Sequence, residues 1–481
     1  MRDKVGLGSA ALVAVGTLVG QGALLIASPL LTRIYGPETF GLYSTFVAYL
    51  GLFSVTCALH WELAIPLPDE KSEAQLVALI ALACVVLTAF IAPCLIVVSS
   101  GVLGISFGGN SSLEALLAMA MALGLSGINV VLTAWGIRNR SFKRLATSKL
   151  SQGLVQAALQ VGIGTVHAEV SSLVWGQLAG LTVGAVVLMA GADLSVASTL
   201  SAGGWRRTGN IARRYRDFAI YSTSSSLVNA GAANLPVLLL AAGHGAAVAG
   251  LYALGYRVVQ VPIRLVGQSI AQVFLSTAVE QKREGQLSRA TLALYRGLAA
   301  FAFPTFVIFM LVAPQLFSVL FGAEWRGAGV FAVYLAPWMA TSLIASSLST
   351  LVSVLEKQRK ETAIQIVYFL ATMFSLTLGW MANSVQLTMA LLGTTGTIVL
   401  AWKVFWILNL VDLESREGLR IAIAETSMFF PVYLIVLWVR AMECSDICIA
   451  VSGGAAIFSV HAFNFFGRKI YRSMLSYSGA N

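Results

Sequence analysis

Two arginines within a long apolar stretch are the residues of this chain best suited to bind an anion. Arg257 and Arg264 occur in LYALGYRVVQVPIRLVGQSIAQVF, residues 251–274. If this stretch is one membrane-spanning helix, Arg257 is near its midplane, and the two arginines share a face because they are about two turns apart. An unpaired arginine at that depth costs at least ~3 kcal/mol, and its planar fork suits phosphate. We therefore predict a water-filled cavity that receives an anion.

The alternative for these arginines is snorkelling, in which the side chain reaches the headgroups at the membrane surface. This reading fits Arg264 better than Arg257, which is too deep. Gln260 and Gln268 fall near the arginine face, so a polar stripe is predicted along the helix, and Pro262 should bend it.

Other apolar stretches also carry polar residues. Gln21 lies among hydroxyl side chains in residues 10–31, and Asn229 follows a serine-rich segment in residues 218–241. Transporters bind substrate where spans are polar or broken near the midplane, so Gln21 and Asn229 are candidate binding residues. A third stripe, in residues 150–166, consists of Gln152, Gln156 and Gln160. Gly16 and Gly20 beside Gln21 are better explained by close helix packing.

Acidic residues are scarce in the apolar stretches, and Glu62 is the one that could bind a coupling proton or pair with an arginine. The simpler reading of Glu62 is a solvated carboxylate at the membrane edge. We predict no metal site and no cofactor, because the Cys and His residues lack ligand spacing. There is also no Walker A loop, G-x-S-x-G or H-E-x-x-H motif, so no catalytic residues are assigned.

The composition indicates a membrane protein. The chain has 481 residues, 58% hydrophobic and 11% charged, whereas a soluble domain has about 25% charged residues. Mean hydropathy is +0.82. Since a spanning helix needs roughly 20 apolar residues, we predict an all-α polytopic protein with about fourteen transmembrane helices. Their ranges are 10–31, 41–61, 77–99, 113–135, 150–166, 173–189, 218–241, 248–274, 290–312, 330–355, 364–381, 387–408, 421–439 and 447–466.

The distribution of positive charge agrees with this count. The net charge is +10, but the cations concentrate in alternate loops rather than forming a nucleic-acid-binding surface. Other cations, including Lys403, are assigned to later loops on the same side. Two clusters contain the most cations: Arg138, Arg140, Lys143, Arg144 and Lys149, and then Arg206, Arg207, Arg213, Arg214 and Arg216. By the positive-inside rule both termini are cytoplasmic, and we expect a multi-pass protein of the bacterial inner membrane.

A short internal repeat predicts two lobes. Gly36-x4-Gly41-Leu-Tyr43 follows the first span, and Gly245-x4-Gly250-Leu-Tyr252 follows the seventh. Two parallel six-helix repeats with two extra helices would explain this placement. We expect an N-lobe at 1–190, a basic cytoplasmic linker at 191–217, a C-lobe at 218–410 and a C-terminal pair with a basic tail at 411–481.

Three stretches carry a resemblance to a known family: GTLVGQGALLIASPLLTRIYGPETFGLYSTF at 16–46, WELAIPLPDEKSEA at 61–74, and the arginine-bearing segment at 251–274. They resemble the polysaccharide or O-antigen (Wzx-type) flippases of the multidrug/oligosaccharidyl-lipid/polysaccharide (MOP) exporter superfamily. The resemblance implies two lobes with a central cationic cavity, and it carries cavity roles onto Arg33, Arg257 and Arg264. For Arg33, anchoring at the membrane interface is the alternative.

The expected function is therefore to flip an undecaprenyl-diphosphate-linked oligosaccharide, such as an O-antigen repeat for lipopolysaccharide biosynthesis, between leaflets by alternating access. The expected partners are that lipid-linked oligosaccharide, membrane lipids, and a polysaccharide polymerase with its chain-length machinery. A lipid II flippase and a cation-coupled multidrug exporter of the same fold are alternatives, although the exporter should hold intramembrane acids. A membrane enzyme is a third, but it would need a large external loop.

Overall fold

The computed structural model describes residues 2–103, 112–193, 204–263, 267–442 and 444–478. Throughout these ranges the secondary structure is helical, as predicted, and no strand occurs in them. Helices satisfy every interior backbone hydrogen bond within one segment, which is why apolar chains adopt them in membranes. The chain divides into two compact units, Met1–Gly250 (unit 1) and Leu251–Asn481 (unit 2).

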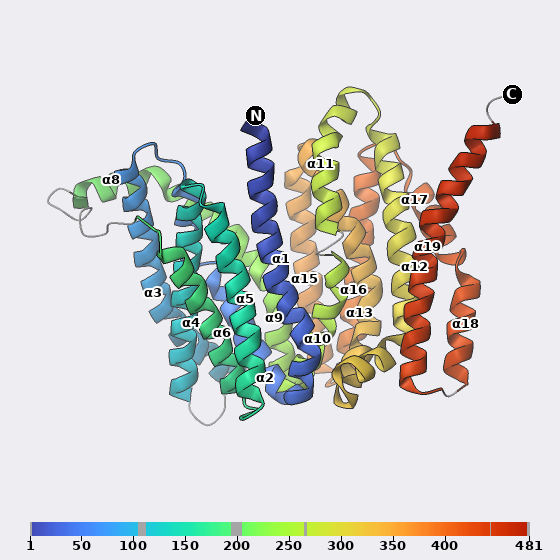
Figure 1. The fold of residues 1–481 in the computed structure, drawn as a ribbon, viewed down its shortest axis with the longest axis horizontal. Helices are drawn as coiled ribbons and strands as arrows, with labels where there is room; N and C mark the ends of the chain where they lie inside the picture. The colour runs from blue at the N-terminus through green and yellow to red at the C-terminus, as the bar shows by residue number, and fades with distance from the viewer. Residues whose placement is uncertain (1, 104–111, 194–203, 264–266, 443, 479–481) are drawn as a thin grey trace. The chain divides into compact units, whose positions relative to one another are not determined.

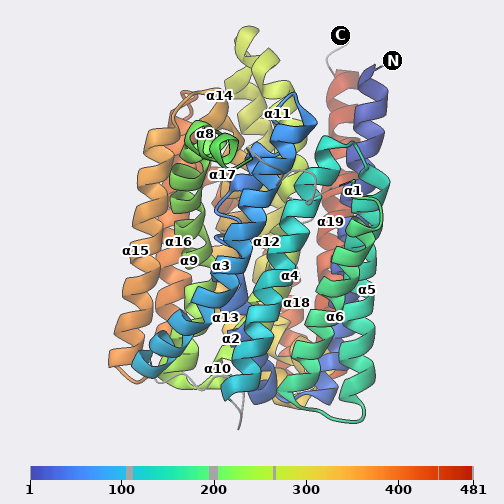
Figure 2. The ribbon, with the colours of Figure 1, turned by 90° about the vertical axis from the view of Figure 1, so that its left-hand side faces the viewer.

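Unit 1 contains long helices that lie alongside one another and a basic helix that lies across their ends (Figures 1 and 2). Helix α5 packs between α1 and α6. The elements are α1 Arg2–Ile34, α2 Pro37–Ser54, η1 Trp61–Ala64, α3 Lys71–Leu103, α4 Ser112–Arg138, α5 Phe142–Gly164, α6 Val170–Met189, α8 Gly204–Asp217, η2 Phe218–Ser222, α9 Thr223–His244 and the start of α10, Ala246–Val259.

Glycines set the closest helix contacts of unit 1. A Cβ atom on Gly20 of α1 would lie 2.3 Å from the carbonyl oxygen of Lys149 on α5, and one on Gly153 would lie 2.1 Å from that of Gly20. The packing role predicted for Gly20 is thus confirmed. The two repeat glycines also meet: a Cβ on Gly41 would lie 1.7 Å from the oxygen of Ala246, one turn before Gly250.

Unit 2 packs the long helix α12 against α13 and α19, and α13 against α16. Asn464 of α19 donates a hydrogen bond to the carbonyl oxygen of Ala300 on α12 (3.0 Å), so the C-terminal helices belong to the core of this unit. The elements after α10 are α11 Gln268–Arg283, α12 Leu287–Phe321, η4 Ala323–Trp325, α13 Arg326–Leu348, α14 Thr350–Val354, α15 Gln358–Met381, α16 Val385–Asn409, α17 Ser415–Ser427, α18 Phe430–Ala441 and α19 Asp446–Ser478.

Each of the predicted spans coincides with a helix or with two consecutive helices. Within the described ranges, ten helices are long and apolar enough to cross a membrane, or eleven if the bent pair α17 and α18 forms one span. The count of fourteen therefore stays a prediction. The division at Gly250 falls inside α10, and the predicted lobe boundaries likewise remain expectations.

Two predicted spans differ from the observed helices. The second span was expected to reach residue 61, but α2 ends at Ser54 and is followed by turns in which Leu59 and His60 have positive φ values of 46° and 55°. Arg138 stabilises the chain that follows, because its guanidinium donates hydrogen bonds to the carbonyl oxygens of Ile65 and Pro68. The eighth span was expected to be one regular helix over 248–274, and this is wrong because a turn at Gln260 interrupts it: α10 ends at Val259, residues 261–263 are helical again, and α11 begins at Gln268.

Candidate functional site

Arg257 lies in the last turn of α10, where the helix stops within an otherwise apolar segment. Its side chain is partly exposed. The C-terminal end of a helix carries a partial negative charge, which favours a cation there. The backbone N–H of Gln260 still donates to the carbonyl oxygen of Tyr256 (3.0 Å), and the turn lies at Gln260. Polar groups and a cation are thus concentrated at one point, and interrupted helices in transporters often bind substrate at such points.

Aromatic packing fixes the end of α10 within unit 2. Tyr252 stacks on Tyr256 with ring centroids 5.6 Å apart, and Tyr256 contacts Trp338 of α13 at 5.8 Å. Trp338 in turn contacts Tyr368 of α15 at 6.2 Å. Gln260, a predicted binding residue, donates a hydrogen bond from Nε2 to the Tyr256 hydroxyl (2.5 Å). Packed aromatic rings before Arg257 and the hydrogen bond of Gln260 after it therefore fix the backbone at Arg257.

The other candidates near the break are only partly described. Arg264 lies outside the described residues, and so does the side chain of Gln268, the first residue of α11. The common face assigned to Arg257 and Arg264 assumed a continuous helix from 248 to 274. Since α10 and α11 are separate helices, helical spacing no longer carries that assignment, and a shared role for the two arginines remains a prediction.

The candidates in unit 1 lie on α1 and α9. Arg33 is in the last turn of α1, and Gln21 is near its middle; both side chains are exposed. Asn229 is exposed on α9. By contrast, the hydroxyl residues Ser28 and Thr32, which follow Gln21 on α1, are buried and donate to the carbonyl oxygens of Leu24 and Ser28 in their own helix.

Glu62 lies in the turns after α2, and the structure gives it a partner that sequence reasoning missed. His60 Nδ1 is 2.9 Å from Glu62 Oε1, and the two side chains are only 14% and 13% exposed. Within the described part of the chain, His60 Nε2 and Glu62 Oε2 are buried without hydrogen-bond partners. The pair therefore retains a buried donor or acceptor site on each side chain. His60 is two residues before Glu62, but the positive φ of His60 could not be anticipated from the sequence.

Two members of the glutamine stripe of α5, Gln156 and Gln160, form a buried hydrogen-bond network, whereas Gln152 is partly exposed. Gln160 donates from Nε2 to the Tyr43 hydroxyl (3.0 Å), and Gln156 donates to Gln177 Oε1 (2.5 Å). The Tyr43 hydroxyl donates to the same Gln177 oxygen (2.9 Å). The Tyr35 hydroxyl closes the network by donating to the carbonyl oxygen of Gln160 (2.8 Å). These side chains hold α2, α5 and α6 together.

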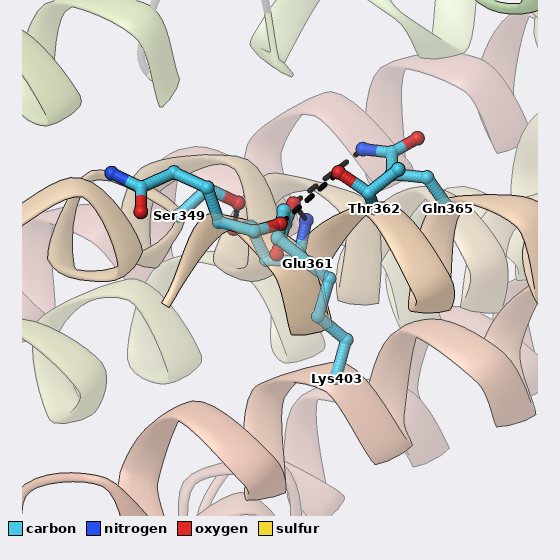
Figure 3. Close-up of polar contacts among 7 residues, drawn as sticks. Ser349, Glu361, Thr362, Gln365 and Lys403 are labelled. Carbon is cyan, nitrogen blue, oxygen red and sulfur yellow. Dashed lines mark hydrogen bonds and ion pairs between the residues drawn. The ribbon is translucent and has the colours of Figure 1, made fainter. Parts of the chain in front are cut away.

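Unit 2 contains a buried ion pair that links α15 and α16 (Figure 3). Lys403 Nζ is 2.5 Å from Glu361 Oε1, and Lys403 is 6% exposed. Gln365 also donates to that oxygen, at 3.5 Å. Glu361 is in the first turn of α15, where the helix dipole favours a carboxylate. The assignment of Lys403 to a loop was wrong; its position inside the predicted span 387–408 was the signal for burial.

These features describe a multi-pass membrane protein with a transporter-type helical fold. Over 96% of this chain, the structure is similar to all of an inward closed conformation of the lipid II flippase MurJ, with 10% identity and a TM-score of 0.70. It is also similar to a MATE transporter in the bent conformation, over 84% of this chain and 96% of that one, with 12% identity and a TM-score of 0.50. At such identities the likeness concerns the fold alone.

The sequence identifies the family. The family model described as polysaccharide biosynthesis protein matches residues 30–329, and the chain belongs to that family. A 112-residue stretch is 28% identical to the teichuronic acid biosynthesis protein TuaB of Bacillus subtilis (strain 168) and spans 23% of each chain. Family and fold agree with the resemblance of residues 16–46, 61–74 and 251–274: the chain belongs to the polysaccharide biosynthesis family, and its fold is similar to those of MurJ and a MATE transporter.

Proposed function

We propose that this protein flips an undecaprenyl-diphosphate-linked oligosaccharide from the cytoplasmic to the periplasmic leaflet of the bacterial inner membrane. The membership of the polysaccharide biosynthesis family supports a glycan cargo. The observation that carries the proposal is Arg257, a cation at the end of α10 where the helix is interrupted. In an apolar segment, a guanidinium at a helix break is suited to a diphosphate.

In the proposed cycle, Arg257 and Arg264 bind the diphosphate, and Arg33, Gln21, Gln260, Gln268 and Asn229 line the path of the sugars. Outward movement of a dianion is favoured by an inside-negative potential by about 2.3 kcal/mol per charge per 100 mV. Two charges give roughly 5 kcal/mol at 100 mV, so transport needs no ATP. With both termini cytoplasmic, a proton returning through Glu62 and His60 would add to this driving force.

Two related functions make different demands on the same fold. A cation-coupled multidrug exporter would need a carboxylate free to bind a cationic drug, whereas Glu361 is already paired with Lys403. A lipid II flippase would share the diphosphate and the lipid anchor, and the similarity to MurJ favours it as the second candidate. The short match to TuaB instead favours a surface polysaccharide, which includes but is not limited to O-antigen.

The test is complementation of a strain that lacks this gene. We expect Arg257→Ala to abolish surface polysaccharide while lipid-linked precursor accumulates on the cytoplasmic side, because the proposed binding site loses the guanidinium that binds the diphosphate. Arg257→Lys should restore part of the export, since it keeps the charge but not the bidentate fork.

Arg296→Ala is the matched control, because it also removes an arginine from a predicted span, 290–312. The Arg296 side chain is 53% exposed, and its Nη2 lies 3.8 Å from Glu417 Oε1, so it is not a candidate for binding the cargo. Protein amount in the membrane is measured by immunoblot for each variant. Normal polysaccharide with well-expressed Arg257→Ala protein would overturn the proposal. Rescue of lipid II export alone would identify the second candidate.

A further inference from the structure

Helix α8 differs from the other helices of unit 1 in composition and in direction. It is short and basic, Gly204–Asp217, and connects through η2 to α9. In Figure 1 it lies nearly perpendicular to α3, and Figure 2 shows it almost end-on at the outer side of the same unit. It contacts α3, whose first residue is Lys71. A helix in this position runs along the membrane surface rather than through it.

The inner face of α8 is fixed to the core of unit 1. Ile211 and Tyr215, one turn apart, are both buried and belong to the hydrophobic core that includes residues of α2, α3 and α4. Because this apolar face is covered by protein, α8 has a defined rotation about its axis. Residues two positions from Ile211 are turned about 200° away from the core.

The outer face of α8 presents arginines. Arg213, Arg214 and Arg216 are exposed. The Arg214 guanidinium lies over the Tyr215 ring at 5.3 Å from its centroid, and its Nη1 is 3.9 Å from Glu73 Oε2. At that distance, and with the Arg214 side chain 66% exposed, the ion pair contributes little binding energy and leaves the guanidinium accessible. Arg213 and Arg216 are thus turned away from the core and Arg214 lies on the flank of α8, so that this helix carries three exposed cations.

We propose that the Arg213/Arg214/Arg216 face of α8 binds the headgroups of anionic phospholipids, such as phosphatidylglycerol and cardiolipin. The charge is complementary, and arginine donates to phosphate oxygens in a bidentate manner. A diphosphate cargo would be better enclosed by a pocket, whereas these three side chains are spread over the exposed side of one helix. The surface therefore fits several headgroups of one leaflet. This inference does not depend on the identity of the cargo.

Native mass spectrometry of the purified full-length protein tests this surface. The protein is titrated in detergent with phosphatidylglycerol and, separately, with phosphatidylethanolamine. We expect R213Q/R214Q/R216Q to weaken the tightest phosphatidylglycerol binding by about fivefold per arginine and to leave phosphatidylethanolamine unchanged. The charge-preserving R213K/R214K/R216K should retain most of the binding.

The matched control is K357Q/R359Q/K360Q, which removes three exposed cations around the start of α15 in unit 2. Equal loss of phosphatidylglycerol in this control would mean that only net charge matters, and would overturn the proposal. Undecaprenyl diphosphate is the second probe. If R213Q/R214Q/R216Q weakens only the binding of undecaprenyl diphosphate and not that of phosphatidylglycerol, α8 binds the cargo and the proposal is wrong. If the triple glutamine variant does not elute as a folded protein, Arg213→Gln alone decides, with a fivefold loss expected and no change contradicting the proposal.

Discussion

The two copies of the repeated motif place a buried tyrosine in the same local sequence but surround it in different ways. In unit 1, the Tyr43 hydroxyl forms hydrogen bonds with the side-chain amides of Gln160, Gln156 and Gln177. In unit 2, Tyr252 is packed by its ring, which stacks on Tyr256. Both copies of the motif thus precede and begin a helix, although φ is −68° at Gly36 and 89° at Gly245, and the neighbouring helices decide whether the tyrosine serves as a hydrogen-bonding or an aromatic residue.

The difference extends to the buried polar contacts that join neighbouring helices in each unit. The network of unit 1 is neutral and joins α2, α5 and α6. Unit 2 combines the aromatic stack with a charged link, Lys403 to Glu361, between α15 and α16. A neutral network loses single hydrogen bonds when one member is changed, but an ion pair leaves an uncompensated charge. We therefore expect the two units to respond to comparable substitutions with different severity.

Breaking the ion pair should give the largest effect. Lys403→Met leaves Glu361, which is only 20% exposed, without its cationic partner, and we expect a loss of about 3 kcal/mol in the free energy of unfolding. Thermal unfolding in detergent measures it, with Lys360→Met at an exposed position as the control. The double variant K403M/E361Q should recover much of the loss. If Lys403→Met and Lys360→Met have the same melting temperature, the ion pair does not distinguish the two units, and only the aromatic packing of unit 2 does.

Filling the contact between the repeat motifs should give the next largest effect. A Cβ on Gly41 meets a backbone oxygen at 1.7 Å, which cannot move as a side chain can. We expect Gly41→Ala to destabilise the protein by about 3 kcal/mol. Gly22→Ala is the control, since no atom lies within 4 Å of its added Cβ and the helix gains up to about 1 kcal/mol. The melting temperatures of the two variants are compared in detergent. If they are equal, α2 and α10 can move apart at Gly41 without a loss of stability.

Removing one hydroxyl from each tyrosine compares the two copies directly. Tyr43→Phe leaves the amides of Gln156, Gln160 and Gln177 without a shared partner and should cost about 1 to 3 kcal/mol. Tyr252→Phe keeps the ring stack and should cost less than about 1 kcal/mol. Melting temperatures of the two variants are measured side by side. A larger loss for Tyr252→Phe would contradict the distinction between hydrogen-bonding and aromatic roles.

Much of the helical fold could be predicted from the sequence, because long apolar stretches have few structural options in a membrane. The failures lie where tertiary contacts override local pattern. No glycine or proline marks the end of α2 at Ser54, and the turns that follow are stabilised by Arg138 from α4. Pro262 did signal a bend, but a proline alone does not distinguish a kinked helix from two separate helices.

The site was predicted less completely than the fold. Arg257 could be found because a charge in an apolar stretch is expensive, and the same argument applied to Lys403 would have predicted its burial. The partners could not be found, since Glu361 and Lys403 come together only when α15 and α16 pack. Gln156 and Gln160 could be read as polar residues, but only the packing of α2 and α6 shows that their amides are already satisfied.

The contact between the repeat glycines also bears on how this sequence can change over generations. Gly41 leaves room for the carbonyl of Ala246, and Gly250 leaves room for that of Pro37, where an added Cβ would approach to 2.2 Å. Each copy of the motif therefore constrains the other, because a larger residue at either glycine would meet the backbone of the opposite copy. The short repeat in the chain thus coincides with a place where its two copies touch.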